Sequence, residues 1–323
     1  MSRLLEESSR TFYVGIQRLP RRLRPAVRVA YLLLRVSDYL EDNQVMSALE
    51  KEELLLLWEE IINGTAGFEK LRPRLQLGED LEADALVASH GELVLDALGK
   101  LPERLRRHIV RHVADSTRGM ARWARRGPDF HTEDDLDDYM HEVAGRVGYL
   151  LTDLFTDHSA LIRRRRAGLM DTAREFGLAL QTVNILRGLR SDFQRGWIYV
   201  PESVVRPLGI SRPDLFKAEH DHRAMEAVDW LGQKADRHLA SARQYIKLLP
   251  VAHHTIRLFC LYPYLFAVRT LALSRNDRRV LGEGVKVPRH EVRHIVRAAS
   301  VRGWSNRWLD SYADRLAMTP ASG

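Results

Sequence analysis

The sequence predicts an all-α protein, and two observations carry this prediction. Apolar residues recur at the spacing of an amphipathic helix through nearly the whole chain. Signals for β-strands are sparse, because no Asn-Gly or Asp-Gly turn lies between alternating apolar runs. None of the breaks between the predicted helices has the composition of an interdomain linker, so we expect one domain over residues 1–323.

Breaks between the helices carry recognisable signals. Gly127-Pro128 ends one helix, and Thr132 followed by Asp135 forms a capping box that starts the next. Three prolines predict a non-helical link over residues 201–213, and residues 274–288 are expected to form a loop. In chain order, the predicted helices are residues 25–42, 50–62, 83–98, 102–126, 133–155, 171–192, 222–249 and 256–273.

The composition is that of a globular protein. Hydrophobic residues make up 45% of the 323 residues and charged residues 29%, which argues against both a disordered chain and an integral membrane protein. The longest uncharged apolar stretch, residues 258–268, is too short to span a bilayer and predicts a core helix. The single cysteine, Cys260, excludes an intrachain disulfide and fits a reducing cytoplasm. Residues 1–10 do not resemble a secretory signal, so we expect a cytoplasmic location.

A net charge of +7 predicts an anionic partner, whether a phosphate compound, an anionic lipid or a nucleic acid. Nucleic-acid binding would depend on the four arginines at 163–166, and no aromatic interleaving or recognition motif accompanies them. We therefore expect no nucleic-acid partner and interpret this run as a solvated helix start. Peripheral contact of the run with an anionic membrane stays open.

A pair of carboxylates closes the first long helix. Asp38 and Asp42 are four residues apart, so both point from one helix face, and Arg35 lies one turn earlier. Two such carboxylates can bridge Mg²⁺ ions that take their other ligands from water and substrate phosphates. An isolated pair of this kind more often marks a solvated acidic helix end. The strongly apolar helix before it favours the metal interpretation without deciding it.

A polar stripe runs along the helix predicted over residues 171–192. Its members follow one another at spacings of three, four and four, which places them on one face. Burying such residues together is costly unless they share a ligand or a hydrogen-bond network. The alternative is a polar face toward water, and the stripe alone does not choose between the two. The stripe consists of Gln181, Asn184, Gly188 and Asp192.

Two glycines, Gly145 and Gly148, lie one turn apart in the helix predicted over residues 133–155. Glycine inside a helix costs roughly 1 kcal/mol relative to alanine, so two of them indicate a reason in packing or in a pocket. The missing side chains let another helix or a ligand tail approach closely. Tight helix contact without a ligand remains an alternative explanation.

Together these segments resemble the squalene/phytoene synthase family over most of the chain. The first aspartate-rich motif, which ends in Asp38-Tyr-Leu-Glu41-Asp42, is closer to the squalene synthase form than to the phytoene synthase form. Four stretches match the family's motifs in order. They are Ser9-Arg10-Thr11-Phe12, the segment from Tyr31 to Asp42, the segment from Tyr139 to Gly148, and Asn184-Ile-Leu-Arg187 followed by Arg195-Gly196 and Ile198-Tyr199-Val200-Pro201.

The resemblance implies an all-α isoprenoid synthase fold, the class I terpenoid synthase bundle, with helices around a central apolar cavity. Members of the family join two prenyl diphosphates head to head, and Mg²⁺ holds the diphosphates at two aspartate-rich helices. One substrate ionises to an allylic cation, the second attacks it, and the resulting cyclopropyl diphosphate rearranges. Squalene synthases then reduce the product with NADPH. Metals and arginines stabilise the departing diphosphate, and the apolar cavity keeps water from the cation.

The family's functional residues carry over to the matching positions of this chain, as the resemblance implies. They are Asp38, Glu41 and Asp42 for the first metal cluster; Asn184 and Asp192 for the second; Arg10, Arg35, Arg187 and Arg195 for the substrate diphosphate or the cofactor; and Phe12, Tyr139, Val143 and Gln181 for the cavity wall, with Tyr139 near the cation.

The second aspartate-rich motif departs from the family pattern. Where the family has Asp-x-x-x-Asp, this chain has Gly188 and Asp192 with Arg190 between them. One interpretation is that the second metal site is weakened or lost. The other is that Asn184, Gly188 and Asp192 resemble the metal triad of class I terpene cyclases, whose middle residue is sometimes glycine. Water can then replace the missing hydroxyl, because Mg²⁺ accepts water readily.

Two further departures concern the cofactor. Trp197 stands where the family has an arginine just before Ile-Tyr, and Pro288 occupies a basic position shortly after Lys286. Bidentate arginine contacts hold phosphate groups most strongly. We therefore expect Mg²⁺ as the cofactor and weak or no dependence on NADPH.

The sequence thus favours a prenyltransferase that condenses two allylic diphosphates, with farnesyl diphosphate as the expected substrate, to a squalene-type product or to presqualene diphosphate. A cyclase or lyase that ionises a single prenyl diphosphate is the first alternative. A non-catalytic homologue that binds isoprenoid or membrane is the second, and the intact Asp38 and Asp42 argue against it. The oligomeric state is not predicted.

Overall fold

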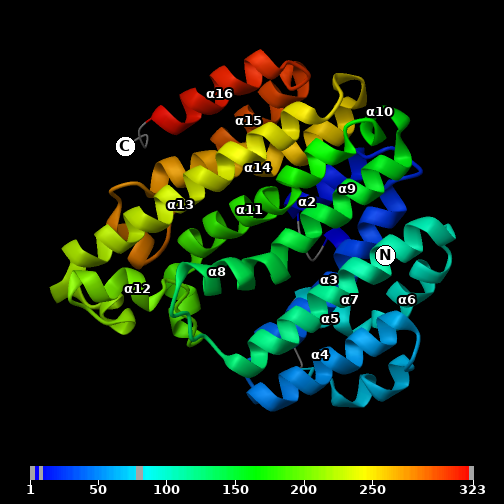
Figure 1. Cartoon of the computed structure of the whole chain (residues 1–323), viewed down its shortest axis with the longest axis horizontal. Coiled ribbons are helices and arrows are strands. Elements are labelled where there is room, and N and C mark those ends of the chain that lie inside the picture. The colour runs from blue at the N-terminus through cyan, green and yellow to red at the C-terminus, as the bar shows by residue number, and fades with distance from the viewer. Residues whose placement is uncertain (1–3, 7–9, 78–82, 320–323) are drawn as a thin grey trace. The chain divides into compact units, whose positions relative to one another are not determined.

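The chain folds into helices. The computed structural model describes residues 4–6, 10–77 and 83–319, without the side chains of residues 10–12, and this described part contains no β-strand. The predicted all-α class is confirmed (Figure 1). Residue contacts divide the chain into unit 1, residues 1–127 and 146–166, and unit 2, residues 128–145 and 167–323. A single family domain over the whole chain stays a prediction.

Unit 1 is built on four long helices, and α7 packs along the other three. Its core includes Trp58 and Trp123, each at most 1% exposed. The four helices are α3 (Arg24–Asp42), α4 (Ala48–Asn63), α7 (Glu103–Arg126) and α9 (Arg146–His158). Shorter helices complete the unit, namely α2 (Arg10–Arg18), α5 (Ala83–Ser89), α6 (Gly91–Gly99) and α10 (Ala160–Arg163).

Local sequence signals explain where these helices begin and end. The backbone N–H of Ser47 donates to Glu50 Oε2 at 2.8 Å, and the Ser47 hydroxyl accepts from the Glu50 N–H, a capping box that starts α4. Gly64 ends α4 with a φ of 77°, which favours glycine. Pro25 lies in the first turn of α3, where a missing N–H is not needed.

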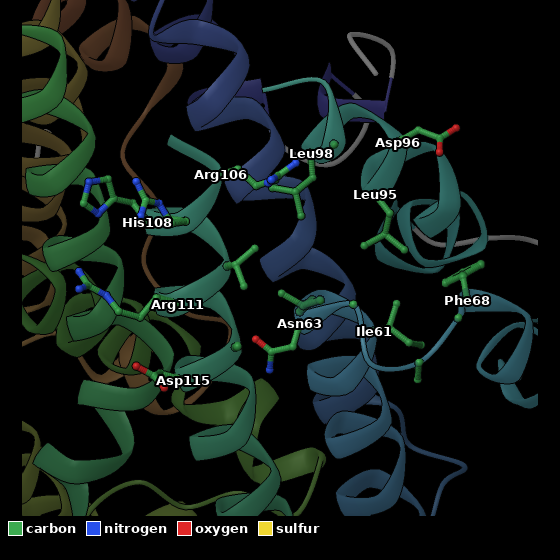
Figure 2. A pocket seen from close by; sticks show the side chains of 18 of the residues that line it. Ile61, Asn63, Phe68, Leu95, Asp96, Leu98, Arg106, His108, Arg111 and Asp115 are labelled. Carbon is green, nitrogen blue, oxygen red and sulfur yellow. The ribbon is translucent and has the colours of Figure 1, made fainter. Parts of the chain in front are cut away.

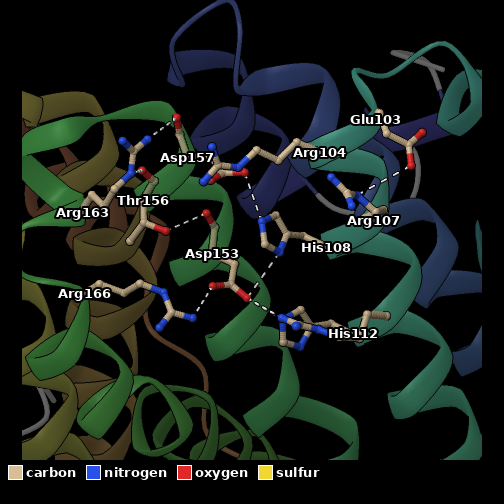
Figure 3. Close-up of polar contacts among 11 residues, drawn as sticks. Glu103, Arg104, Arg107, His108, His112, Asp153, Thr156, Asp157, Arg163 and Arg166 are labelled. Atoms are coloured by element: carbon tan, nitrogen blue, oxygen red, sulfur yellow. Dashed lines mark hydrogen bonds and ion pairs between the residues drawn. The ribbon is translucent and has the colours of Figure 1, made fainter.

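A polar network joins α7 to α9 (Figure 3). The Asp153 carboxylate, 3% exposed, accepts a hydrogen bond from Arg166 at 2.9 Å and lies 2.9 Å from His112 Nε2. His108 Nε2 lies 3.1 Å from Asp157 Oδ2 one turn further along α9. Burial would raise the pKa of Asp153, but the hydrogen bonds from His112 and Arg166 hold it well below its usual range. The ionised carboxylate therefore stabilises the pairing of α7 with α9.

Unit 2 is centred on α14 (His254–Ser274), most of whose side chains are buried. α13 (Asp221–Leu248), α15 (Arg289–Arg302) and α16 (Asn306–Met318) pack against it. The fully buried Arg257 of α14 donates to the carbonyl oxygens of Ile246 and Leu249, both at 2.7 Å, and so satisfies the C-terminal end of α13. The unit also contains α8 (Glu133–Met140), the π-helical turn η3 (His141–Gly145) and α11 (Arg166–Gln194) from residue 167 onward.

The predicted core helix at residues 256–273 is confirmed as the centre of α14. Among the described residues, Val251–Ser274 is the one helical stretch long and apolar enough to cross a bilayer, and most of it is buried inside the protein. Cys260 within it is 1% exposed, and burial raises the pKa of its thiol. The residue is thus a packed thiol rather than a nucleophile.

The prediction of one continuous helix over residues 83–98 is wrong, because the helix breaks at His90 into α5 and α6. Gly91 follows the break, and a Cβ atom there would lie 2.5 Å from the Phe68 ring. The helix predicted over residues 133–155 is interrupted by η3, which inserts wider turns between α8 and α9. The spacing of apolar residues predicts a regular helix, so it gives no sign of the break at His90 or of the π-helical turn.

The later segments are more helical than predicted. The link over residues 201–213 contains α12 (Glu202–Val205) and the 3₁₀ turns η4 (Arg206–Leu208) and η5 (Arg212–Phe216), and residues 274–288 contain η8 (Arg278–Leu281). The prediction also missed α15 and α16. In α15 only Ile295 and Ala299 are buried, so its apolar stripe is narrow and lies among basic residues.

Candidate active site

The acidic cluster predicted at the end of α3 is extended by a third carboxylate. The Arg35 guanidinium donates from Nη1 to Asp38 Oδ2 at 2.8 Å and from Nε to Asp84 Oδ1 at 2.7 Å, with a further contact from Nη2 to the second Asp84 oxygen. Asp84 lies in the first turn of α5. Asp42 follows Asp38 by one turn and is exposed. Arg35 thus links two helices at the predicted metal ligands.

Negative charge exceeds positive charge in this cluster. Although 30% of the Asp38 side chain is exposed, burial of the carboxyl raises its pKa to about 6. The charge of Arg35 opposes the shift, and the carboxylates of Asp42 and Asp84 increase it. Burial lowers the pKa of Arg35 less than Asp38 and Asp84 raise it, so the guanidinium stays cationic. The two carboxylates of Asp38 and Asp84 thus share one cation.

These carboxylates suit Mg²⁺. No three His, Cys, Asp or Glu side chains in the described part of the chain enclose a metal position by themselves. Mg²⁺ does not require such a cage, because it keeps several waters and binds through one or two carboxylates plus substrate phosphates. Asp38 and Asp42 are accessible to such an ion, whereas Glu41 is 6% exposed. The oxygen donors and their surplus charge fit the metal.

The predicted polar stripe lies on α11. Asn184 is exposed and Gln181 is half-buried, whereas Asp192 is 8% exposed. Oδ1 of Asp192 accepts a hydrogen bond from Arg195 Nη2 at 2.5 Å, so a cation of the same chain neutralises this carboxylate. A Cβ atom at Gly188 would lie 3.0 Å from Asp192 Oδ2. The structure brings Asp192, Arg195 and Gly188 together.

Tyr139 belongs to a cluster of four aromatic rings. Its ring centroid lies 5.2 Å from that of Tyr199, 5.6 Å from that of Trp197 and 5.6 Å from that of Phe130. The hydroxyl groups of Tyr139 and Tyr199 are 3.1 Å apart and hydrogen-bonded. Trp197, one of the departures from the family pattern, is therefore a neighbour of the predicted cation-binding tyrosine.

A buried lysine that was not predicted fastens α8, the helix of Tyr139, to α13. Lys234 is 1% exposed, and its Nζ lies 2.7 Å from Glu133 Oε1 and 2.5 Å from Asp137 Oδ1. The two carboxylates are one turn apart on α8. The sequence signal that could have indicated the burial of Lys234 is its position three residues after the apolar Leu231, on the same face of α13.

The predicted close approach at Gly145 is confirmed as a helix contact. A Cβ atom there would lie 3.1 Å from Leu178 Cδ1 of α11. The tighter contact is at Gly177, where a Cβ atom would lie 2.2 Å from the carbonyl oxygen of Ala144. α11 therefore packs on the backbone of η3, which contains the half-buried Val143. Single π-helical turns occur frequently at functional sites.

The remaining predicted residues are less defined. Ser9 lies outside the described residues, and Arg10 and Phe12 are described only as backbone in α2. Arg187 is exposed on α11. Gly284, with a φ of 77°, brings the loop before α15 to α11, because a Cβ atom there would lie 3.1 Å from the Arg187 carbonyl oxygen.

A separate groove of about 1340 Å³ lies between α4, α6 and α7 (Figure 2). Ile61 and Leu95 contribute apolar surface to it, and arginines of α7 lie along its rim. Arg111 and Arg118 are engaged in ion pairs with Asp153 and Glu59. None of the predicted site residues lines the groove.

Comparisons with known proteins agree with the motifs. The family model described as squalene/phytoene synthase matches residues 5–291. Squalene synthase of Schizosaccharomyces pombe is 28% identical over 299 residues, which cover 91% of this chain and 63% of that protein. Human squalene synthase is 29% identical over 292 residues, which cover 88% and 65%. The chain spans just under two thirds of the length of these relatives.

Solved structures show the same fold. A TcSQS complex with the ligand E5700 has a TM-score of 0.83 and 23% identity, and the match covers 99% of this chain and 91% of that one. A dehydrosqualene synthase in complex with ligand has a TM-score of 0.64 and 20% identity, with coverage of 97% and 95%. The predicted isoprenoid synthase helical fold is confirmed.

Proposed function

Because the chain belongs to the squalene/phytoene synthase family, we propose that it is a Mg²⁺-dependent prenyltransferase that joins two allylic prenyl diphosphates head to head. The proposed substrate is farnesyl diphosphate, and the product is presqualene diphosphate or a squalene-type hydrocarbon. The observation that carries the proposal is the carboxylate cluster in which Asp38 and Asp84 share Arg35. Its surplus negative charge supports binding of Mg²⁺ with a diphosphate as the remaining ligand.

In the first step the substrate's C–O bond breaks and its electron pair leaves on the diphosphate. Asp38 and Asp42 would hold the metal, which when bound stabilises the charge of the leaving group. Arg35 would act chiefly as a positioning residue, because its donors are directed to Asp38 and Asp84. Direct contact of Arg35 with the diphosphate stays a prediction. The same holds for Glu41 as a metal ligand.

The resulting allylic cation needs electron density and protection from water. The ring faces of Tyr139 and Trp197 would supply the electron density. A cation over an aromatic ring is stabilised by roughly 0.5 to 2 kcal/mol. The buried Tyr199 and Phe130 rings beside them support the protection from water. The double bond of the second substrate then attacks the cation, and loss of a proton closes the cyclopropane ring.

The second metal cluster is proposed to be weaker than the first. Asn184 and Asp192 are its candidate ligands, and a metal would have to compete with Arg195 for the Asp192 carboxylate. Gln181 and Val143 are proposed to line the substrate cavity, and Arg10, Phe12 and Arg187 to contact the substrate. These assignments rest on the family motifs.

NADPH is proposed to contribute little. Arg195 could replace the family arginine at position 197 only by leaving Asp192, to which it donates at 2.5 Å. Trp197 packs against Tyr139 instead of offering a guanidinium. Without hydride transfer, the cation would end by proton loss, by capture of water, or as presqualene diphosphate that is not processed further.

A cyclase or lyase that ionises one prenyl diphosphate is the second candidate. The spacing of Asn184, Gly188 and Asp192 supports it, together with the space that Gly188 leaves beside the Asp192 carboxylate. A cytoplasmic location is proposed on the ground that the sole cysteine is a buried thiol.

The deciding experiment is incubation of the purified chain with farnesyl diphosphate and Mg²⁺, with and without NADPH, followed by mass spectrometry of the products. Presqualene diphosphate or a squalene-type product supports the proposal, and a product from one farnesyl chain supports the cyclase.

The Asp38→Asn variant serves as the control and should lose Mg²⁺-dependent turnover while keeping its helical circular dichroism. Turnover by Asp38→Asn at the rate of the unchanged protein would refute the metal assignment. Stoichiometric NADPH oxidation with squalene as the sole product would refute the cofactor proposal.

A further inference from the structure

Four basic residues line a groove of about 320 Å³ between the last two helices, which run from orange to red in Figure 1. His294, Arg297 and Arg302 belong to α15, and Arg315 belongs to α16. Among the described residues that line the groove, none is acidic. Ligand pockets typically measure roughly 300 to 1000 Å³, so this groove suits a small ligand. The charge of its lining favours an anion.

The arginines of this groove are not neutralised by neighbouring acids. Within the described part of the chain, Arg297, Arg302 and Arg315 are exposed and form no ion pair with a carboxylate. The acids of the same two helices pair instead with cations of α13 and α14. These pairs are Glu291 with Arg269 at 2.5 Å, Asp310 with Lys247 at 2.9 Å, and Asp314 with Arg243 at 2.8 Å.

The large groove of α4, α6 and α7 differs in this respect. Three acids, Glu92, Asp96 and Asp115, line it together with its arginines. Arg111 and Arg118 there already form ion pairs with carboxylates. An anion that entered the large groove would have to displace these partners, whereas the described guanidinium groups of the small groove have no carboxylate to release. The small groove is therefore the better anion site of the two.

An aromatic and apolar wall completes the small groove. The rings of Trp308 and Tyr312 on α16 are stacked with 4.6 Å between their centroids, and the Arg315 guanidinium lies 5.6 Å from the Tyr312 ring. Val301, which is 66% exposed, lines the groove from α15. The Tyr312 hydroxyl is buried and has no hydrogen-bond partner among the described residues. Leaving a buried hydroxyl unsatisfied is costly, and an oxygen atom of a ligand would remove this cost.

We propose that this groove binds a soluble phosphorylated compound that carries a flat aromatic ring, the chemical class of the nucleoside triphosphates. Arg297, Arg302 and Arg315 bind the phosphate groups, because guanidinium groups match phosphate oxygens in geometry and charge. The flat ring packs against Trp308, whose indole is half-buried in the groove wall. None of the described residues that the family motifs assign to the substrate or the cofactor lines this groove. This binding goes beyond the proposed function and does not depend on it.

Isothermal titration calorimetry of the full chain with ATP tests the proposal, in EDTA so that the proposed Mg²⁺ site holds no metal. We expect one ATP per chain and weaker binding as salt is added. Inorganic triphosphate, which lacks the ring, should bind roughly tenfold more weakly, and adenosine, which lacks the phosphates, should give no measurable heat. The double variant Arg297→Gln/Arg302→Gln should bind ATP more than tenfold more weakly, because it removes two charge-assisted contacts.

A second variant separates stacking from a general loss of structure. Trp308→Leu should lower the affinity for ATP to that for inorganic triphosphate and leave triphosphate binding unchanged. Loss of both affinities together, with the helical circular dichroism retained, would contradict the packing of the ligand ring against Trp308.

The matched control is Arg293→Gln/Arg307→Gln, which removes the same charge from exposed positions of α15 and α16 outside the groove lining. It should change ATP binding less than twofold. An equal loss in this control would assign the binding to net charge alone and overturn the proposal. ATP binding that neither double variant changes, or no ATP binding at all, would also overturn it. A random oligonucleotide or phosphatidylglycerol vesicles that bind while ATP does not would assign the groove to a larger polyanion instead.

Discussion

Arg35 donates to Asp84 through Nε at 2.7 Å and so ties the carboxylate pair of α3 to the first turn of α5. The same guanidinium donates to Asp38 at 2.8 Å. Asp84 therefore fixes the orientation of Arg35, and Arg35 in turn fixes the orientation of a proposed metal ligand. A residue outside the family's recognised motif would thus support the proposed metal site.

The first prediction concerns this support. Asp84→Asn should lower turnover roughly 10- to 100-fold and raise the Mg²⁺ concentration needed for half-maximal rate, because Arg35 loses a charged partner. A Mg²⁺ titration of the initial rate measures both effects. Asp96→Asn, an exposed acid on α6, is the matched control and should behave like the unchanged protein. An unaltered Mg²⁺ requirement in Asp84→Asn would remove Asp84 from the site.

The second prediction concerns Gly188. If head-to-head synthesis is the native reaction, Gly188→Asp should increase the yield of cyclopropyl or squalene-type product, because it restores the family's missing carboxylate. If the protein is a cyclase, the same change should reduce turnover, since the new carboxyl lies beside Asp192, where a Cβ atom would be 3.0 Å from Oδ2. Product profiles of the two proteins distinguish the cases. Identical profiles and rates would show that Gly188 lies outside the site.

The third prediction tests the contact between α11 and η3. Gly177→Ala should destabilise the fold by about 1–3 kcal/mol, because its Cβ would lie 2.2 Å from the Ala144 carbonyl oxygen and the π-helical turn must shift. Urea unfolding measures this change. Gly168→Ala on the same helix is the control, since its Cβ would meet Leu248 at 3.4 Å, an ordinary contact. That variant should be neutral or more stable by up to about 1 kcal/mol.

The fourth prediction concerns acid. A carboxylate whose pKa is depressed in the folded state stabilises the fold above its unfolded pKa, and this stabilisation is lost as the pH falls through the folded pKa. Burial alone would raise the pKa of Asp153, but the hydrogen bonds from His112 and Arg166 outweigh this effect and hold the pKa below its usual range. Asp153→Asn should therefore lower the free energy of unfolding at pH 7 by about 1–3 kcal/mol. The difference from the unchanged protein should shrink below pH 4, as denaturant titrations at several pH values would detect. A difference independent of pH would contradict this account.

Local patterns predicted α3 well, since its apolar periodicity and closing acids are contained within one helix. The partner of Arg35 could not be predicted in this way, because Asp84 is 49 residues away and looks like an ordinary acid in a helix's first turn. Lys234 was missed for a related reason. A lysine at helical spacing from apolar residues is unremarkable until tertiary packing places two carboxylates around its ammonium group.

The aromatic cluster illustrates a different limit. Tyr139 was predicted from its motif, and Trp197 was recognised as a tryptophan in the place of a family arginine, with no partner assigned to its ring. Their 5.6 Å separation arises because residues 128–145 and the chain after α11 fold together within unit 2. Sequence spacing does not encode such a contact. The contact gives Trp197, which replaces a family arginine, a candidate role beside the Tyr139 ring.

The burial of Cys260 has a practical consequence for site-specific labelling. Its thiol is 1% exposed and has a raised pKa, so little reactive thiolate is available to a maleimide in the folded protein. A cysteine introduced by Val301→Cys would therefore react with a solvatochromic dye much faster than Cys260 does. Cys260 would not need to be replaced to prevent background labelling. The colour of that single dye would report directly on the polarity of the surroundings at the end of α15.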